Sequence, residues 1–191
     1  MTTLAPTLYA RTFPRVASWL RDLILIVISA LLVGIFAQVK IPLPFTPVPL
    51  TGQTFAVLLV AAALGSKRGA ASMAFYVALG AIGLPIFAGG ASGMAYFSGA
   101  TLGYLIGFVL AAFVVGLLAE RGLERSVRTS IIPFLVGTVI IYACGVLWLA
   151  LILDSVGKAL AAGFVPFVIG DVIKLTAAAL ALPAAWRLAK G

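Results

Sequence analysis

Six runs of apolar residues alternate along the chain with short polar or irregular stretches. The runs cover residues 22–39, 54–64, 70–82, 100–119, 131–153 and 167–186. The longest approach the roughly 20 residues that an α-helix needs to cross the hydrocarbon core of a bilayer. The pattern predicts an all-α integral membrane protein with six transmembrane helices. The run 54–64 is short, because as a helix it would reach only about 16 Å.

The stretch 40–53 is mostly apolar, yet it contains four prolines, Pro42, Pro44, Pro47 and Pro49. Proline lacks the amide hydrogen that a helix interior needs, so this stretch is predicted to be extended. Irregular backbone at membrane depth needs protein or a cavity around it. We therefore expect the stretch to pack on the bundle beside the short run 54–64 and to leave room for a polar pocket near one membrane face.

Residues 83–99 form a second irregular stretch, with no charged residue, five glycines and several aromatic residues. Glycines such as Gly90 permit positive φ angles and close approach of the backbone to a ligand. The length of the loop and its Phe87, Tyr96 and Phe97 predict a lid or a pocket wall. The alternative is a helix connection that needs tight turns.

Asp171 and Lys174 lie three residues apart in the last apolar run. Residues at this spacing share one face of a helix. Ionisable residues inside a membrane span indicate a functional site by default, because they are costly there. The alternatives are a structural ion pair that fixes helix packing, or a lysine that extends to the lipid headgroups.

Composition supports the membrane class, since 63% of residues are hydrophobic and 9% are charged, against about 25% charged in soluble domains. We expect an N-terminal cytoplasmic segment, 1–21, followed by a single six-helix membrane domain, 22–191. The sequence has no histidine and one cysteine, Cys144, which excludes the usual zinc sites and histidine-based triads. The net charge of +8 lies in short loops between apolar runs, which argues against a nucleic-acid partner.

The distribution of positive charge predicts the orientation. Ten of the 13 Lys and Arg residues fall on the side of the two termini if there are six spans: Arg11, Arg15, Arg21, Lys67, Arg68, Arg121, Arg125, Arg128, Arg187 and Lys190. The positive-inside rule then places both termini in the cytoplasm. The stretches 40–53 and 83–99 and the charged pair fall together on the outer side. A pocket there, with Gln53, Asp171 and Lys174 as polar groups, suits a small molecule with an amide-like end and an apolar body.

Several segments in this order resemble the BioY family, the biotin-specific S components of energy-coupling factor (ECF) vitamin transporters. They include Pro47-Val-Pro-Leu-Thr-Gly-Gln-Thr54, Leu84-Pro-Ile-Phe-Ala-Gly-Gly90 and Pro166-Phe-Val-Ile-Gly-Asp-Val-Ile-Lys174, together with 99–108 and 142–148. The resemblance implies an S-component fold in which loops cap an extracytoplasmic biotin pocket. It also implies that Asp171 and Lys174 bind polar groups of the vitamin, with help from Gln53 and Tyr142.

The resemblance further implies partners, namely a transmembrane T subunit and ATPase subunits in a prokaryotic cell membrane. The chain has no Walker motif, so ATP hydrolysis would come from those subunits. Ala30 and Gly34 form a small-xxx-small pair, which permits close helix approach and resembles the docking surface for the T subunit. The alternative is packing inside the chain's own bundle. No cofactor is expected, and biotin is the transported ligand.

Three other functions compete with a biotin-binding uptake subunit. Another vitamin's S component is the nearest. A membrane-embedded enzyme could use Asp171 and Lys174 as an acid–base pair, but the sequence offers no second carboxylate nearby, no histidine and no cluster of metal ligands. A stand-alone carrier usually shows paired repeats, and we find no clear repeat. We therefore expect no catalysis.

Overall fold

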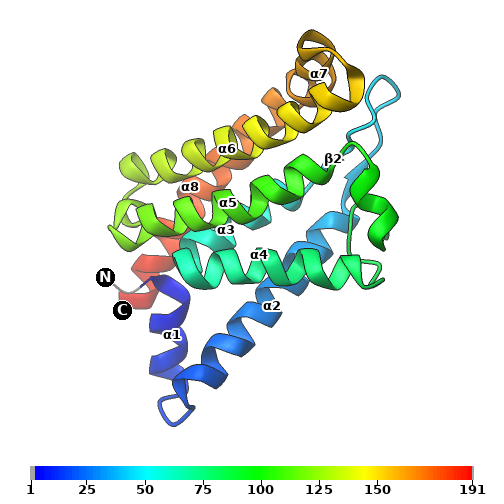
Figure 1. The fold of residues 1–191 in the computed structure, drawn as a ribbon. Coiled ribbons are helices and arrows are strands. Elements are labelled where there is room, and N and C mark those ends of the chain that lie inside the picture. Colours follow the sequence, from blue (N-terminus) through cyan, green and yellow to red (C-terminus); the bar gives the residue numbers. More distant parts are fainter. Residues whose placement is uncertain (1–2, 191) are drawn as a thin grey trace.

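The computed structural model describes residues 3–190 and is almost entirely helical (Figure 1). The helices are α1 Leu4–Thr12, α2 Ser18–Gln38, α3 Gln53–Leu64, α4 Ser66–Ala81, α5 Leu102–Glu120, α6 Val127–Leu153, α7 Val156–Gly163 and α8 Val168–Lys190. Two short strands, β1 Lys40–Ile41 and β2 Leu50–Thr51, and three 3-10 helices, η1 Met94–Ser98, η2 Leu123–Arg125 and η3 Val165–Phe167, complete it. The predicted ranges 1–21 and 22–191 also include residues 1, 2 and 191 and the side chain of Lys190, which the structure does not describe.

Each of the six predicted apolar runs forms a helix, respectively α2, α3, α4, α5, α6 and α8. Within residues 3–190, four helical stretches are long and apolar enough to cross a membrane: α2, α5, α6 and the continuous segment Val156–Arg187. The all-α membrane class is therefore confirmed, whereas α3 and α4 are shorter than a full span.

Helix α3 lies at the centre of the bundle. It has 12 residues and contacts α1, α2, α4, α5, α6 and α8. Gly65 has a φ of 86° and separates α3 from α4, a conformation that glycine adopts at no steric cost. Because protein surrounds α3 on all sides, its backbone needs no lipid contact, and the short helix is tolerated.

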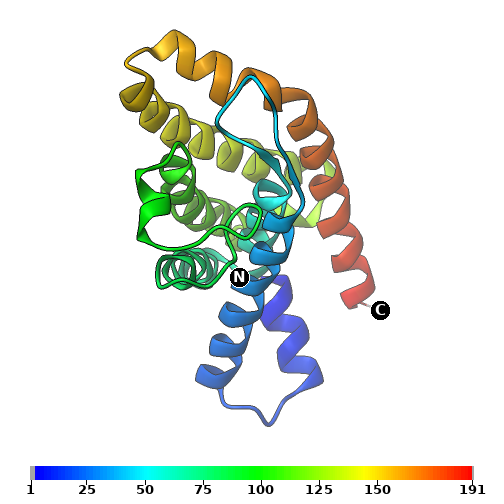
Figure 2. The ribbon, with the colours of Figure 1, turned by 90° about the vertical axis from the view of Figure 1, so that its right-hand side faces the viewer.

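The proline-containing stretch is extended, as predicted, and its two ends pair as a β-hairpin, which the sequence did not indicate. Lys40 pairs with Thr51 and Ile41 pairs with Leu50 in antiparallel register. The Thr46 hydroxyl near the tip donates to the carbonyl oxygen of Ala162 in α7 at 2.6 Å. Figures 1 and 2 show the hairpin beside α7, at the end of the bundle opposite the junction of α1 and α2.

Helices α1 and α7 were not predicted. The sequence of α1 is mixed in polarity, and the helix forms where Leu4 and Pro6 are buried against the bundle. Helix α7 begins after Ser155, whose hydroxyl accepts a hydrogen bond from the Lys158 amide at 3.3 Å, a common N-terminal cap. That serine was the available sequence signal for α7.

Ala30 and Gly34, the pair expected to dock a T subunit, are both buried, and a Cβ added at Gly34 would lie 3.2 Å from the Cβ of Ile86. Gly34 thus lets the 83–99 loop pack closely on α2, which favours the alternative of packing inside the chain's own bundle. Exposed apolar side chains on the same helix include Ile35, which is 65% exposed.

Replacing Gly34 with leucine should destabilise the protein. The added side chain overlaps Ile86 in a packed region, and overpacking costs about 1–3 kcal/mol. Thermal unfolding in detergent should therefore show a lower Tm than the native protein. Ile35→Leu, a change of shape on the exposed side of the same helix, is the control and should leave the Tm nearly unchanged. A native Tm for Gly34→Leu would restore the docking interpretation.

Candidate functional site

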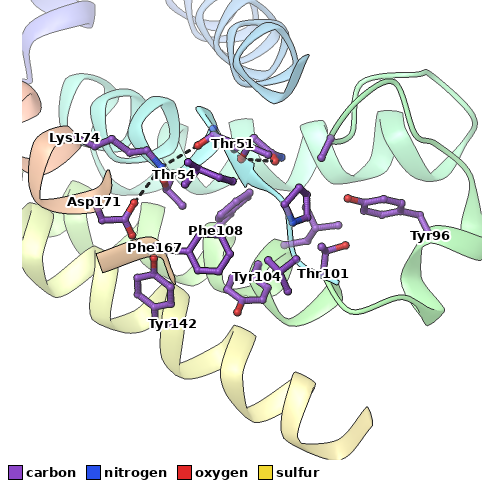
Figure 3. Close-up of a pocket in the computed structure, with 16 residues that line it drawn as sticks. Thr51, Thr54, Tyr96, Thr101, Tyr104, Phe108, Tyr142, Phe167, Asp171 and Lys174 are labelled. Atoms are coloured by element: carbon purple, nitrogen blue, oxygen red, sulfur yellow. Dashed lines mark hydrogen bonds and ion pairs between the residues drawn. The ribbon is translucent and has the colours of Figure 1, made fainter. Parts of the chain in front are cut away.

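A pocket lies where the hairpin, α3, α5, α6 and the first turns of α8 meet (Figure 3). Its empty volume, counted to the mouth and including open solvent, is about 530 Å³. Residues from distant parts of the chain line it: Val48, Pro49, Leu50, Thr51, Gln53, Thr54, Ala88, Tyr96, Thr101, Tyr104, Leu105, Phe108, Tyr142, Phe167, Asp171 and Lys174.

Asp171 provides the buried carboxylate of the pocket, with 6% of its surface exposed. One oxygen accepts a hydrogen bond from the Tyr142 hydroxyl of α6. The other oxygen lies 3.0 Å from the ammonium nitrogen of Lys174. The i, i+3 spacing therefore does bring the two charges together as an ion pair.

Lys174 joins α8 to the hairpin and to α3. Its Nζ donates to the carbonyl oxygen of Thr51 at 2.9 Å, to the Thr54 hydroxyl at 3.1 Å and to Asp171 at 3.0 Å. These three bonds use all three donors of an ammonium group. Figure 3 shows these contacts of Lys174 at one end of the pocket.

Gln53 connects the pocket to the loop that covers it. Its side-chain nitrogen donates to the Tyr76 hydroxyl at 2.8 Å, and its side-chain oxygen accepts from the Thr51 hydroxyl at 3.0 Å. The Tyr76 hydroxyl in turn donates to the carbonyl oxygen of Ile86 at 3.1 Å. A line of hydrogen bonds thus runs from the pocket to the 83–99 loop.

Tyr96 lines the pocket, as expected for a wall residue of this loop. Burial raises the pKa of its hydroxyl, so Tyr96 is a neutral hydrogen-bonding group at pH 7. Phe87 lies behind it, fully buried and stacked on its ring at a centroid distance of 4.6 Å. Gly90 is exposed, with a φ of 79°, and does not line the pocket. Phe87 therefore supports the wall of the pocket from behind, and Gly90 lies on a turn outside it.

Several lining residues were not predicted. Tyr104 and Phe108 lie one turn apart on α5 and face the pocket, and the Tyr104 hydroxyl donates to the carbonyl oxygen of Gly163 at 2.7 Å. Their i, i+4 spacing was a usable signal. Thr51 and Thr54 lie close to Gln53 in the sequence. Their proximity to this predicted site residue was a second usable signal.

The arrangement has two chemically different parts. Aromatic and aliphatic side chains form a floor, with Phe108 and Phe167 among them. Asp171, Lys174 and Gln53 form a polar end. The ion pair is neutral as a unit, and bringing a further charge beside it in a low-dielectric site is costly. This pocket is therefore suited to a ligand with a neutral polar end and an apolar body.

Comparison with known proteins identifies a consistent set of relatives. The model of the BioY family matches residues 6–191. The chain is 46% identical over 161 residues to the biotin transporter BioY of Thermotoga maritima, covering 84% of this chain and 93% of that protein. It is 37% identical over 168 residues to the biotin transporter BioY of Rhizobium etli, covering 84% and 90% of the two chains.

A solved structure shares the fold. It is the crystal structure of the S-component for biotin from an ECF-type ABC transporter, with a TM-score of 0.79 and 27% sequence identity. The match covers 90% of this chain and 92% of the other.

Proposed function

The chain belongs to the BioY family, and on this basis we propose that it is the biotin-binding subunit of a vitamin uptake system in a prokaryotic cell membrane. The observation that carries the proposal is the pocket itself. A neutral Asp171–Lys174 pair at its polar end lies against an aromatic floor, in a chain that is 46% identical to a biotin transporter. Binding, with no catalysis, is the role we assign to these residues.

The hydrogen bonds among the polar side chains of the pocket favour one orientation of biotin. Each carboxylate oxygen of Asp171 accepts one bond, and each has a further lone pair for a ureido N–H. Lys174 has no spare donor for an anionic carboxylate. The uncharged ureido ring therefore meets Asp171, its carbonyl accepts the second side-chain N–H of Gln53, whose first bonds Tyr76, and the valerate chain extends toward the mouth.

A binding isotherm in detergent tests the function, and two analogues test the orientation. We expect saturable binding of biotin, with no competition from riboflavin or thiamine. Biotin methyl ester, which lacks the carboxylate charge, should bind within about tenfold of biotin, whereas diaminobiotin, which lacks the ureido ring, should lose at least about a hundredfold. No binding of biotin would overturn the function. If diaminobiotin bound tightly and biotin methyl ester did not bind, the opposite orientation would hold, with the carboxylate of biotin at the polar end of the pocket.

We further propose six spans, cytoplasmic termini and an outward-facing pocket. The charge distribution supports this orientation. In a Cys144→Ser background, a cysteine at the exposed position Phe45 should react in intact cells with an impermeant maleimide. A cysteine at the exposed position Arg128 should react only after permeabilisation. The opposite pattern would invert the assignment.

Likeness to the S-component for biotin from an ECF-type ABC transporter supports a transmembrane T subunit and ATPase subunits as partners in the lipid bilayer. Biotin uptake should then require co-expression of those subunits. Equal uptake without them would favour a stand-alone carrier.

A further inference from the structure

A second cavity opens at the end of the bundle opposite the hairpin, between α1, α2, α4 and α5. Its empty volume, mouth included, is about 870 Å³. Its charged lining residues are Arg11, Arg21, Arg68 and Glu120, and it shares no lining residue with the biotin pocket. Figures 1 and 2 place the α1–α2 junction at this end. The proposed biotin site makes no use of this cavity.

Two of the arginines are held in place by one carboxylate. Arg68 lies with its Nε 2.8 Å from Asp22 Oδ1, and its Nη2 donates to Asp22 Oδ2 at 3.0 Å. The Nε of Arg21 lies 3.4 Å from Oδ1 of the same residue. A guanidinium group has five N–H donors, so Asp22 orients both groups while most donors of Arg21 stay available to a ligand.

Glu120 adds the second negative charge to this region. Its Oε1 accepts from the Ser66 amide and from the Ser66 hydroxyl, each at 2.8 Å. This oxygen thus caps the start of α4. Arg11, Arg21 and Arg68 carry three positive charges, and Asp22 and Glu120 carry two negative charges. The net charge of this region is therefore positive by one, which favours a singly charged anion.

Exposed aromatic side chains lie on the segments that carry two of the arginines. Trp19, on α2 with Arg21, is 68% exposed, and Phe13, directly after α1 with its Arg11, is 52% exposed. Tyr9 packs on Phe13 at a centroid distance of 5.0 Å. Tryptophan and tyrosine are enriched at the level of lipid headgroups, which supports a position of these two helix ends at that level.

We propose that this cavity binds the phosphate group of an anionic phospholipid headgroup. Arginine suits phosphate because its planar fork presents two parallel N–H donors. Basic pockets between membrane helices on the cytoplasmic side bind anionic headgroups in this way. Arg11 and Arg21 hold the phosphate, Arg68 keeps α4 and α2 together through Asp22, and the aromatic cluster packs on the glycerol and acyl region.

Native mass spectrometry with added lipids tests the site. We expect phosphatidylglycerol to bind more tightly than phosphatidylcholine, which carries no net charge. Arg11→Gln and Arg21→Gln should each weaken phosphatidylglycerol binding by at least about tenfold, the scale of a lost charge-assisted hydrogen bond. Arg15→Gln is the matched control, because it removes the same charge from an exposed residue that does not line the cavity. It should cost less than about fivefold.

Biotin binding, measured in parallel, should stay native in all three variants. Thermal unfolding in detergent reports separately that each variant is folded, so failure of biotin binding in the native protein would overturn the proposed function without affecting this test. Equal losses in the three variants, or no preference for phosphatidylglycerol, would show diffuse surface charge and overturn the site. Inorganic phosphate that binds as well as the lipid and displaces it would show that a free anion is the ligand, which would overturn the lipid assignment.

Discussion

Replacing Asp171 with asparagine should raise the Kd for biotin about 10- to 100-fold. The substitution keeps the shape of the side chain but removes the charge, and a hydrogen bond to a charged group contributes about 1.5–3 kcal/mol. Asp171 is buried and faces the pocket, so water cannot replace the lost interaction. Isothermal titration in detergent measures the change directly.

The control for Asp171→Asn is a second buried carboxylate, far from the pocket. Glu124 in η2 is 0% exposed and accepts a hydrogen bond from the indole nitrogen of Trp186 at 3.1 Å. Glu124→Gln should leave biotin affinity native, because Glu124 lies outside the pocket. Native affinity in folded Asp171→Asn would mean that the Asp171–Lys174 pair is structural, and the assignment of the ureido ring would fail with it.

Replacing Lys174 with methionine should be the most destabilising single change in the pocket. It removes three hydrogen bonds between α8, the hairpin and α3, and it leaves Asp171 as a buried carboxylate without its ammonium partner. Breaking a buried pair from one side costs about 3–5 kcal/mol. Thermal unfolding in detergent should show a strongly lowered Tm, and biotin binding should fall because the hairpin loses its connection to α8.

The double variant Asp171→Asn/Lys174→Met separates charge from packing. If the unpaired carboxylate of Asp171 causes most of the destabilisation in Lys174→Met, the double variant should have a higher Tm than Lys174→Met alone. A purely steric role for Lys174 predicts no such recovery of the Tm. Lys158→Met is the matched control, since Lys158 is exposed on α7, and it should change stability by less than about 0.5 kcal/mol. A double variant less stable than the single one would contradict the charge argument.

Local features of the chain were predictable because their causes lie within a few residues. Proline removes a helix donor wherever it stands, so the extended, non-helical conformation of 40–53 followed from its four prolines. A helix turns by the same angle everywhere, so Asp171 and Lys174 had to share a face. Apolar runs near the length of a membrane span indicated the helices in order.

Long-range contacts were beyond this reasoning. Lys174 finds acceptors in Thr51 and Thr54, 123 and 120 residues away, and no periodicity connects such distant positions. Phe87 was expected at the pocket surface as an aromatic residue of a glycine-rich loop. It lies inside instead, because it packs on both Tyr76 and Tyr96 and the tertiary structure offers it a fully buried position.

Ala30 and Gly34 show the same limit. A small-xxx-small pattern permits close approach of another segment, but it is identical whether that segment belongs to the same chain or to a partner. Only the folded structure, with Ile86 packed on Gly34, decides between the two. By itself the sequence determined the membrane class, the helix order, the extended conformation of 40–53 and the charged pair, since these depend on local chemistry. The tertiary structure decided which side chains face the pocket, which support it and where the arginines gather, because those depend on how distant segments pack together.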